Sequence, residues 1–370
     1  MRKGIILATL VLASLAVLLG AGAQPAAAAS AKLRVAFVLL GSVDDQGWNT
    51  AQYEGIQVVQ KRLGKRVSVS ITQNVADPAR AEEVFRDYAR KGYDIIFGTT
   101  FEYMEPMLKV AAEYPKVRFM HCAGSKILPN LGVYMVRIEQ GDYLAGYAAG
   151  LMGYKNVGTV ATMPIAEVAR GINAFTLGLA RGLAESGTAH DPERINTVVW
   201  LNSWRDAVRE NALAEDLIAA GHDLIREMAD TSDSSKAACA KGVASIGYGT
   251  DSVRYGAACA LTSTNFAWGP VYVRIVKQVL AGTWKSGETF TGFEGGGVEL
   301  APFGKAVPRA VRRKVLALQA KMAKGDDMSF AGPVFDQAGT LRVPQGAKAP
   351  DEALLSMDWL VKGVKGTLPH

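Results

Sequence analysis

Aromatic and carboxylate side chains stand directly after short apolar runs of this sequence. Asp45 and Trp48 follow the run 33–40 (LRVAFVLL), and Phe101 follows the run 94–98. An aromatic ring can stack on a flat heterocycle, and a carboxylate accepts hydrogen bonds from the N–H groups of such a ring. This combination predicts a site for a small planar ligand that carries N–H donors.

The same residue types recur in the second half of the chain. Four further candidates follow later apolar runs: Trp204, Asp230, Asp251 and Trp268. Asn173 is the eighth candidate, because an amide in the middle of a predicted helix is unfavourable there without a partner. Some of these residues also suit plainer roles. Asp45 stands where a helix cap is expected, and Trp204 and Trp268 suit packing between two domains.

Signatures of catalysis are missing from the sequence. The first apolar run is followed by GSVDDQG rather than GxGxxG, and there is no Walker A, GxSxG or HExxH pattern. We therefore expect a binding protein with no catalytic residues, no metal and no cofactor. A secreted nucleoside hydrolase is the alternative among enzymes, and it would need a carboxylate cluster or a nucleophile that the sequence does not offer.

The apolar runs alternate with amphipathic stretches from residue 33 onward, and the rhythm restarts after Tyr154. Such an alternation predicts parallel sheets with helices on both faces, in two consecutive α/β units. Ligands of open α/β sheets bind beyond the carboxyl ends of the strands. All the candidates except Asn173 stand at such ends, so we expect them to meet at one edge.

The N-terminus has the order of a secretory signal peptide. Arg2 and Lys3 precede an apolar run over 5–19, and small residues follow up to Ser30. This pattern predicts a signal peptide over residues 1–30 and export to the periplasm. Cys122 is the first cysteine, so we expect a soluble mature protein with no lipid anchor.

Composition narrows the class of protein further. Charges of both signs are mixed along the chain, whose formal net charge is +6, so we read them as ordinary solvated surface and expect no nucleic-acid partner. About 340 mature residues exceed what one core usually supports, which favours two domains. Cys239 and Cys259 are candidates for a disulfide, but we expect three buried thiols with Cys122.

Several segments together resemble one family. They include Asp44-Asp45-Gln46-Gly47-Trp48-Asn49, Gly98-Thr99-Thr100-Phe101, Met163-Pro164-Ile165-Ala166-Glu167-Val168 and Asn202-Ser203-Trp204-Arg205-Asp206. Over about residues 33–302 the chain is similar to the basic-membrane-protein family of ABC-transporter solute receptors, which includes purine-nucleoside receptors. The resemblance implies an aromatic stacking residue at Trp48 and an acidic ligand residue at Asp251. The acid near 122–123 and the lysine that nucleoside receptors carry are missing here, which favours a free base.

The resemblance also implies the architecture and the partners. It implies an α/β type I periplasmic-binding-protein fold, with two Rossmann-like lobes of parallel sheet joined by three hinge crossovers. We expect residues 31–153 plus about 257–292 in the N-terminal lobe, and 154–256 plus about 293–370 in the C-terminal lobe. The expected protein is a monomeric periplasmic receptor that binds a purine base, a nucleoside or a related heterocycle and delivers it to an inner-membrane ABC permease. A sugar receptor of the same fold is the alternative among binding proteins. A DNA-binding regulator of related fold is disfavoured by the N-terminal leader and by the lack of a helix-turn-helix.

Overall fold

The computed structural model describes Met1 and residues 32–369. The predicted signal peptide therefore lies, apart from Met1, outside the described residues. Among the described residues, no helix has the length and hydrophobicity needed to cross a membrane.

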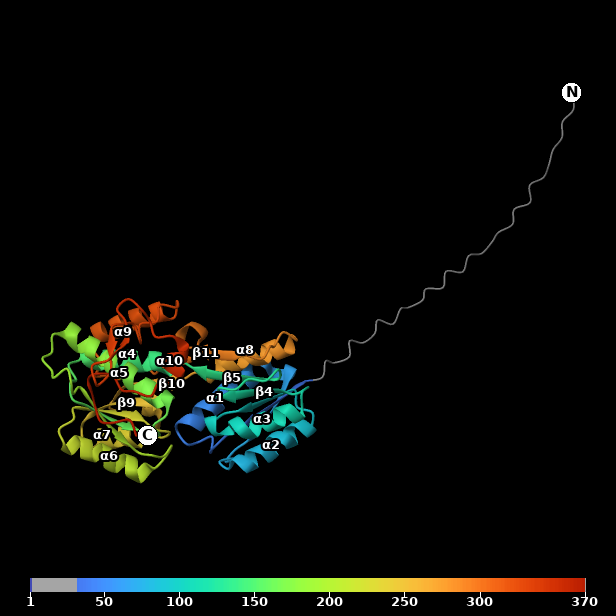
Figure 1. The fold of residues 1–370 in the computed structure, drawn as a ribbon, viewed down its shortest axis with the longest axis horizontal. Coiled ribbons are helices and arrows are strands. Elements are labelled where there is room, and N and C mark those ends of the chain that lie inside the picture. The colour runs from blue at the N-terminus through green and yellow to red at the C-terminus, as the bar shows by residue number, and fades with distance from the viewer. Residues whose placement is uncertain (2–31, 370) are drawn as a thin grey trace. The chain divides into compact units, whose positions relative to one another are not determined.

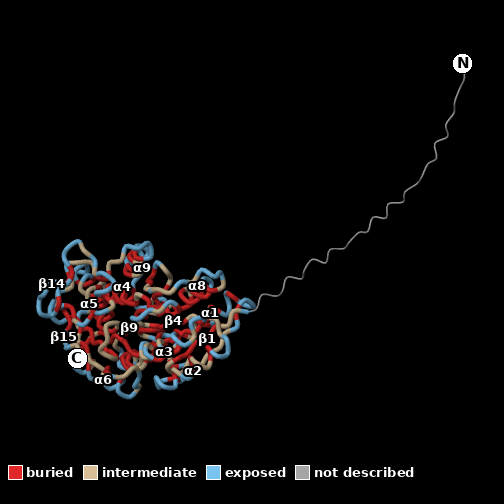
Figure 2. The backbone as a smooth tube through the Cα atoms, turned by 45° about the vertical axis from the view of Figure 1, so that its right-hand side comes forward, coloured by how far each residue is buried: buried red, intermediate tan, exposed pale blue. Residues whose placement is uncertain are grey.

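Five strands from the first half of the chain and one later strand, β11, build a parallel sheet. Its order is β11-β5-β4-β3-β1-β2, and every pair of neighbouring strands is parallel. The strands are β1 (Leu33–Val38), β2 (Val67–Thr72), β3 (Ile95–Gly98), β4 (Arg118–Cys122), β5 (Leu131–Val136) and β11 (Glu288–Thr291). The central strands read as continuous apolar runs because both faces of the sheet are covered, and they are the buried part of this sheet in Figure 2.

Four helices cover this sheet, and together they form what we call the first lobe. α2 (Pro78–Arg90) and α3 (Met104–Glu113) pack on one face, while α1 (Trp48–Leu63) and α8 (Trp268–Leu280) pack against each other on the other face. α2 begins as the sequence predicts: the Asp77 carboxylate accepts a hydrogen bond from the Ala79 N–H, and proline occupies the first helical position.

The second sheet has the order β12-β10-β9-β8-β6-β7-β15 and is parallel except for the pair β10–β12. Its strands are β6 (Val157–Ala161), β7 (Asn196–Trp200), β8 (Leu224–Met228), β9 (Ala244–Gly249), β10 (Ala260–Phe266), β12 (Val298–Leu300) and β15 (Val364–Lys365). With its helices and the C-terminal segment, this sheet makes the second lobe.

The helices of the second lobe lie in two layers. α6 (Ala207–Ala219) and α7 (Asp233–Ala240) cover one face. On the other face α4 (Ile138–Leu151) and α5 (Ala166–Ser186) approach so closely that a Cβ on Gly178 would lie 2.0 Å from the carbonyl oxygen of Tyr143. α9 (Arg309–Met322) packs on α4, and α10 (Asp351–Leu355) packs on α5. The C-terminal segment adds a small hairpin of β13 (Val334–Phe335) and β14 (Leu341–Val343).

The chain passes between the two sheets three times (Figure 1). It crosses through α4 after β5, at Ala267 between β10 and α8, and over residues 292–297 between β11 and β12. We expected residues from about 257 onward in the first lobe, but β10 pairs with β9 and β12 inside the second sheet. The second crossing therefore follows Phe266. β10 first pairs with the edge of β9, and only then does the chain leave the second lobe.

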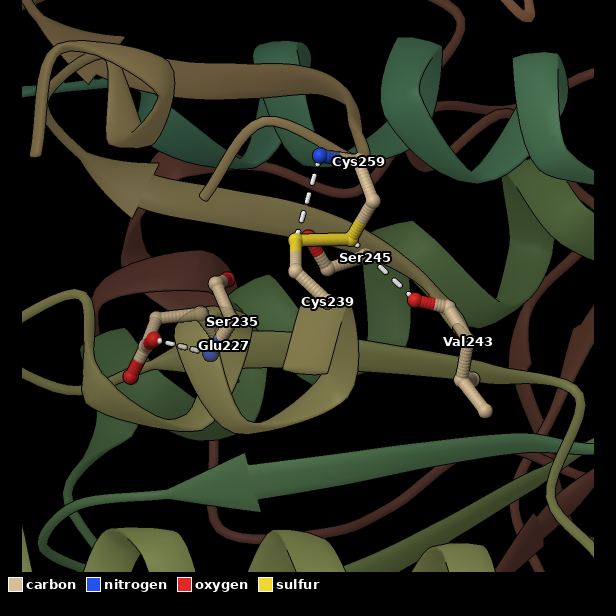
Figure 3. Close-up of a disulfide and its surroundings, with 6 residues drawn as sticks. All are labelled: Glu227, Ser235, Cys239, Val243, Ser245 and Cys259. Carbon is tan, nitrogen blue, oxygen red and sulfur yellow. Dashed lines mark hydrogen bonds between the residues drawn. A yellow bond between two sulfur atoms is a disulfide. The ribbon is translucent and has the colours of Figure 1, made fainter. Parts of the chain in front are cut away.

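The cysteines differ from the expectation of three thiols. Cys239 in α7 and Cys259 just before β10 form a disulfide (Figure 3), while Cys122 is a buried free thiol. The spacing of Cys239 and Cys259 in the sequence does not by itself indicate a disulfide. The two residues meet only because α7 and the start of β10 both pack around β9.

Candidate ligand-binding site

A pocket with an empty volume of about 460 Å³ lies between the two lobes. Its walls come from the segments that follow β1, β3 and β4 in the first sheet and β6, β7 and β8 in the second, together with β9 itself. The lining residues are Leu40, Trp48, Thr100, Phe101, Ala123, Thr162, Ile165, Glu167, Val168, Trp204, Asp230 and Tyr248. The pocket thus occupies the place that the parallel topology assigns to a ligand, beyond the carboxyl ends of the strands.

Trp48 presents ring surface to this pocket. Its indole Nε1 donates a hydrogen bond of 2.8 Å to the carbonyl oxygen of Thr99. The ring also packs edge-on against Phe266 and Trp268, with centroid distances of 4.9 and 5.6 Å. Because the N–H is already satisfied and the ring is fixed, Trp48 offers the pocket a rigid apolar surface.

A second aromatic pair reaches across the cleft. Phe101 of the first lobe and Trp204 of the second have ring centroids 6.3 Å apart, in an edge-on arrangement. The Trp204 Nε1 donates to Glu102 Oε1 over 2.9 Å, which links the lobes by a hydrogen bond to a charged acceptor. One wall of the pocket is therefore formed by residues from both lobes.

Two carboxyl groups of the second lobe line the pocket. Burial raises the pKa of Glu167 to about 7, although Arg170 acts in the opposite direction, and the Tyr248 hydroxyl donates to Glu167 over 3.2 Å. Burial, together with repulsion from Asp45 and other acids, raises the pKa of Asp230 well above its ordinary value. A ligand that donates hydrogen bonds to these groups relieves part of their desolvation.

Two buried ion pairs lie near Glu167, one between α5 and α4 and the other between β8 and α4. Arg170 pairs with Glu139 over 2.9 Å, and Arg226 pairs with Asp142 over 2.8 Å. Gly171 leaves room for the second pair, since a Cβ there would lie 2.7 Å from an oxygen of Asp142. Glu167 is therefore backed by a buried layer of charged residues that do not themselves line the pocket.

His121 supports the loop that carries Thr100 and Phe101. Its Nε2 lies 2.8 Å from the carbonyl oxygen of Thr100, and burial lowers the pKa of His121 to about 4. The ring is neutral near pH 7, and its Nε2–H donates to the carbonyl. His121 thus positions the loop and is not among the residues that line the pocket.

Two polar contacts beside the pocket hold the lobes together. The Thr250 hydroxyl donates to the carbonyl oxygen of Gln46 over 2.5 Å, and Arg254 pairs with Glu54 over 2.6 Å. Gln46 adopts a φ of 73°, an uncommon backbone conformation for a residue with a side chain. We call this arrangement, with the lobes in contact at Gln46 and at Glu54, the closed state.

Of the eight residues singled out in the sequence, the structure brings four to the pocket: Trp48, Phe101, Trp204 and Asp230. The other four, Asp45, Asn173, Asp251 and Trp268, do not line it. Each of these four has a structural partner that explains its position.

The two displaced acids are helix caps. The Asp45 carboxylate is buried and accepts hydrogen bonds from the backbone N–H groups at the start of α1, including that of Thr50 over 2.9 Å. Asp251 accepts from the Val253 N–H over 3.1 Å and begins a short 3₁₀ helix (Ser252–Tyr255). The carboxylate of an acid that follows a strand can face the ligand or accept hydrogen bonds from the start of the next helix. The carboxylates of Asp45 and Asp251 accept hydrogen bonds from the helix.

The other two displaced residues belong to the core. Trp268 is fully buried and stacks on Phe266 with a centroid distance of 5.4 Å. Asn173 donates to the carbonyl oxygen of Trp359 over 2.7 Å and accepts from the Val361 N–H over 2.9 Å. The amide of Asn173 thus holds the C-terminal segment on α5. These two hydrogen bonds give the mid-helix asparagine the polar partners that it requires.

Sequence reasoning missed the pocket residues Glu167 and Tyr248. Glu167 follows β6 as Asp230 follows β8, so the same strand-end rule applies to it. The sequence hides Glu167 because it lies at the start of a helix, α5, where a glutamate normally faces water. Tyr248 lies within β9 and not after it, so the strand-end rule does not select it. In the described part of the chain, no group of three or more His, Cys, Asp or Glu side chains is arranged to hold a metal ion.

Comparison with known proteins gives relatives over nearly the whole length. The chain is 34% identical over 346 residues to a purine-binding protein of Brucella abortus, covering 93% of this chain and 96% of that one. It is 32% identical over 339 residues to a putative ABC transporter glucose-binding protein of Haloferax volcanii, covering 91% of this chain and 81% of that one. Among solved structures, an ABC-transporter solute-binding protein of Conexibacter woesei superposes with a TM-score of 0.64 at 26% identity, covering 80% of this chain and 97% of that one.

The fold is therefore the type I periplasmic-binding-protein fold that the sequence predicts, with two lobes of parallel-dominated sheet and a pocket between them. The family model of PnrA-like ABC transporter substrate-binding proteins matches residues 32–325. The chain belongs to the PnrA-like family of ABC transporter substrate-binding proteins.

Proposed function

We propose that this protein is a periplasmic receptor that binds a purine base or a closely related planar heterocycle and delivers it to an ABC permease of the inner membrane. The proposal combines the family, which supplies the role in transport, with the chemistry of the pocket, which supplies the ligand class. The predicted signal peptide over residues 1–30 supplies the location.

The observation that carries the ligand class is the pairing of fixed ring surfaces with partly buried carboxyl groups. Trp48 and Trp204 each use their indole N–H on the protein, which leaves ring surface for the ligand. Glu167 and Asp230 are the acids of the pocket wall. A purine offers two flat faces for stacking and N–H groups at its edge. One molecule therefore stacks on the ring surfaces and donates hydrogen bonds to the carboxyl groups.

The contacts between the lobes favour a small ligand. The lobes are already in contact at Thr250 and Gln46 and at Arg254 and Glu54. A free base fits this enclosure better than a base that carries a ribose.

The printed functions of the relatives favour the same class and name one competitor. The Brucella abortus relative is named as a purine-binding protein, and the Haloferax volcanii relative as a putative glucose-binding protein. A sugar also stacks on aromatic rings and donates hydroxyl groups to carboxylates. It needs polar partners around its whole rim, however, and residues such as Leu40, Ile165 and Val168 occupy much of this wall.

The test is to identify the ligand directly. Protein purified without refolding is denatured, and the released small molecules are analysed by mass spectrometry. Calorimetry on ligand-free protein then compares adenine, guanine, hypoxanthine, adenosine and glucose. We expect a base to bind at least about tenfold more tightly than adenosine, and glucose not to bind. Preferential binding of glucose would assign the protein to the sugar receptors.

A second assay addresses the enzyme alternative. The protein is incubated with adenosine, inosine and guanosine, and the products are separated by chromatography. We expect no release of free base above the rate without protein. Release that scales with protein concentration would contradict the assignment as a receptor.

A further inference from the structure

The segment between residues 305 and 324 carries seven lysine and arginine residues and no acidic residue. It contains α9, the helix of the second lobe that packs on α4. No residue of α9 lines the ligand pocket. The charge of this segment therefore calls for an explanation other than ligand binding.

α9 is strongly two-sided. Val311, Val315, Leu318 and Met322 are buried, and their spacing defines the face that packs on the lobe. On the opposite side, positions spaced by three or four residues form one exposed row of Arg309, Arg313, Leu316 and Ala320, and Lys324 continues this row in the turn that follows the helix. We call these five residues the outer stripe. Lys321 is also exposed.

The cations of the outer stripe are not neutralised by the protein. Two other cations of the segment have internal partners: Lys314 pairs with Glu185 over 2.7 Å, and Arg312 donates to the carbonyl oxygens of Val307 and Gly304. Arg309, Arg313 and Lys324 form no ion pair with any residue that the structure describes. The nearest following acid, Asp326, pairs with Lys348 over 3.0 Å.

An apolar side chain stands in the middle of these charges. Leu316 is 51% exposed, and its neighbours in the exposed row are Arg313 and Ala320. A helix with cations on its outer face and a large apolar residue among them has the chemistry of a helix that rests on an anionic membrane surface. An acidic protein surface is the competing partner for these charges, and the experiment below separates it from a membrane.

We propose that the outer stripe of α9 binds the surface of a membrane that contains anionic phospholipids. The phosphate groups pair with Arg309, Arg313 and Lys324, and Leu316 enters the boundary between headgroups and acyl chains. Because the family serves transporters that lie in a membrane, such a contact keeps the receptor at the surface where its permease lies. The contact is reversible, since one helix face with a few charges and a single apolar side chain binds weakly.

The experiment measures co-sedimentation of the purified protein with vesicles. One set consists of phosphatidylcholine, and a second of phosphatidylcholine mixed with phosphatidylglycerol. We expect binding to the anionic vesicles only, and loss of this binding at high salt because the contact is electrostatic. The triple variant Arg309→Gln, Arg313→Gln, Lys324→Gln should lower the partition coefficient at least about tenfold. Leu316→Gln alone should lower it by a smaller factor.

A matched control removes the same charge elsewhere. Arg80→Gln, Lys91→Gln and Lys109→Gln change cations of the first lobe that pair with acids in the structure. This control should sediment like the wild type, and both triple variants should keep the wild-type melting temperature. Equal losses in both triple variants would mean that net charge alone drives binding, which would overturn the proposal. No binding to anionic vesicles would also overturn it, and if the stripe variant then failed to bind the permease in a neutral nanodisc, the surface would belong to a protein contact.

Discussion

Gly47 of the first lobe lies directly against the backbone of Asp230 of the second lobe. A Cβ on Gly47 would be 2.4 Å from the carbonyl carbon of Asp230, a separation that real Cβ contacts essentially never show. Gly47 immediately precedes Trp48, and both Trp48 and Asp230 line the pocket. The closed state is therefore compatible only with glycine at this position, and this glycine precedes a residue of the pocket wall.

The first prediction concerns this contact. Gly47→Ala should lower the affinity for the purine base by about a hundredfold or more, because the methyl group prevents closure and the affinity of a closed-state ligand falls with the closed fraction. Small-angle scattering with ligand should then show no compaction. Gly287→Ala is the control, since a Cβ there meets no atom within 4 Å. Wild-type affinity in Gly47→Ala would mean that ligand binds without this approach of the lobes.

The second prediction concerns the stacking surface. Trp48→Ala should weaken binding by about 1–3 kcal/mol, or roughly ten- to a hundredfold, because the ligand loses one ring face. Trp284→Phe is the comparison, since Trp284 lies outside the pocket and should leave the affinity unchanged. Calorimetry on both folded variants decides. Equal losses at the two positions would show that the effect is not stacking.

The third prediction separates the two strand-end aspartates. Asp230→Asn should weaken base binding at least about tenfold, because a buried acceptor becomes partly a donor. Asp251→Asn should change the affinity less than about threefold, because Asp251 caps a 3₁₀ helix and does not line the pocket. The resemblance to the family implies instead that Asp251 binds the ligand. If Asp251→Asn proved the weaker binder, the pocket would have to extend to the loop 249–251.

The fourth prediction concerns pH. The pKa of Glu167 is raised from 4.5 to about 7, so the native state holds a proton that the unfolded chain releases earlier. The stability that this proton contributes is complete below about pH 4.5 and is lost as the pH rises to about 7. Glu167→Gln removes this loss. Its melting temperature relative to wild type should therefore be higher at about pH 8 than at about pH 4.

His121 also makes the stability of the fold depend on pH, in the opposite direction to Glu167. Its pKa is lowered to about 4, so its contribution has the opposite slope, and stability rises with pH between about 4 and 6.5. Comparing wild type with Glu167→Gln at each pH cancels the His121 contribution, which both proteins share. A melting-temperature difference that does not change with pH would show that Glu167 titrates at its ordinary pKa in the native state.

Much of the architecture is readable from the sequence, because a strand buried on both faces must be apolar along its whole length. The run 33–40 predicts β1, which spans Leu33–Val38, and the cap at Asp77 predicts the start of α2. The carboxyl ends of parallel strands lie at one edge of each sheet, so the strand-end rule alone brings Trp48, Phe101, Trp204 and Asp230 to one pocket.

Other elements carry no such pattern. α4 is buried on nearly every side, so it lacks the 3.6-residue alternation that reveals a surface helix. β5 and the C-terminal strands were likewise not predicted, and β10 was expected in the other lobe. Reading the charges as evenly mixed was also wrong for one segment, since residues 305–324 carry seven cations and no acid, and α9 and the turn after it expose unpaired cations on one face.

The sequence by itself determined the fold class, the family and the sheet edge at which the pocket lies, because these follow from periodicity, strand ends and motifs that are local in the chain. Only the tertiary structure decided which side chains enter the pocket. Asp251 turns to a helix two residues away, Asn173 finds its partners at Trp359 and Val361, and Cys239 finds Cys259. A polar or sulfur-containing side chain is satisfied by whichever partner packing brings within reach, and that choice depends on residues far away in the sequence.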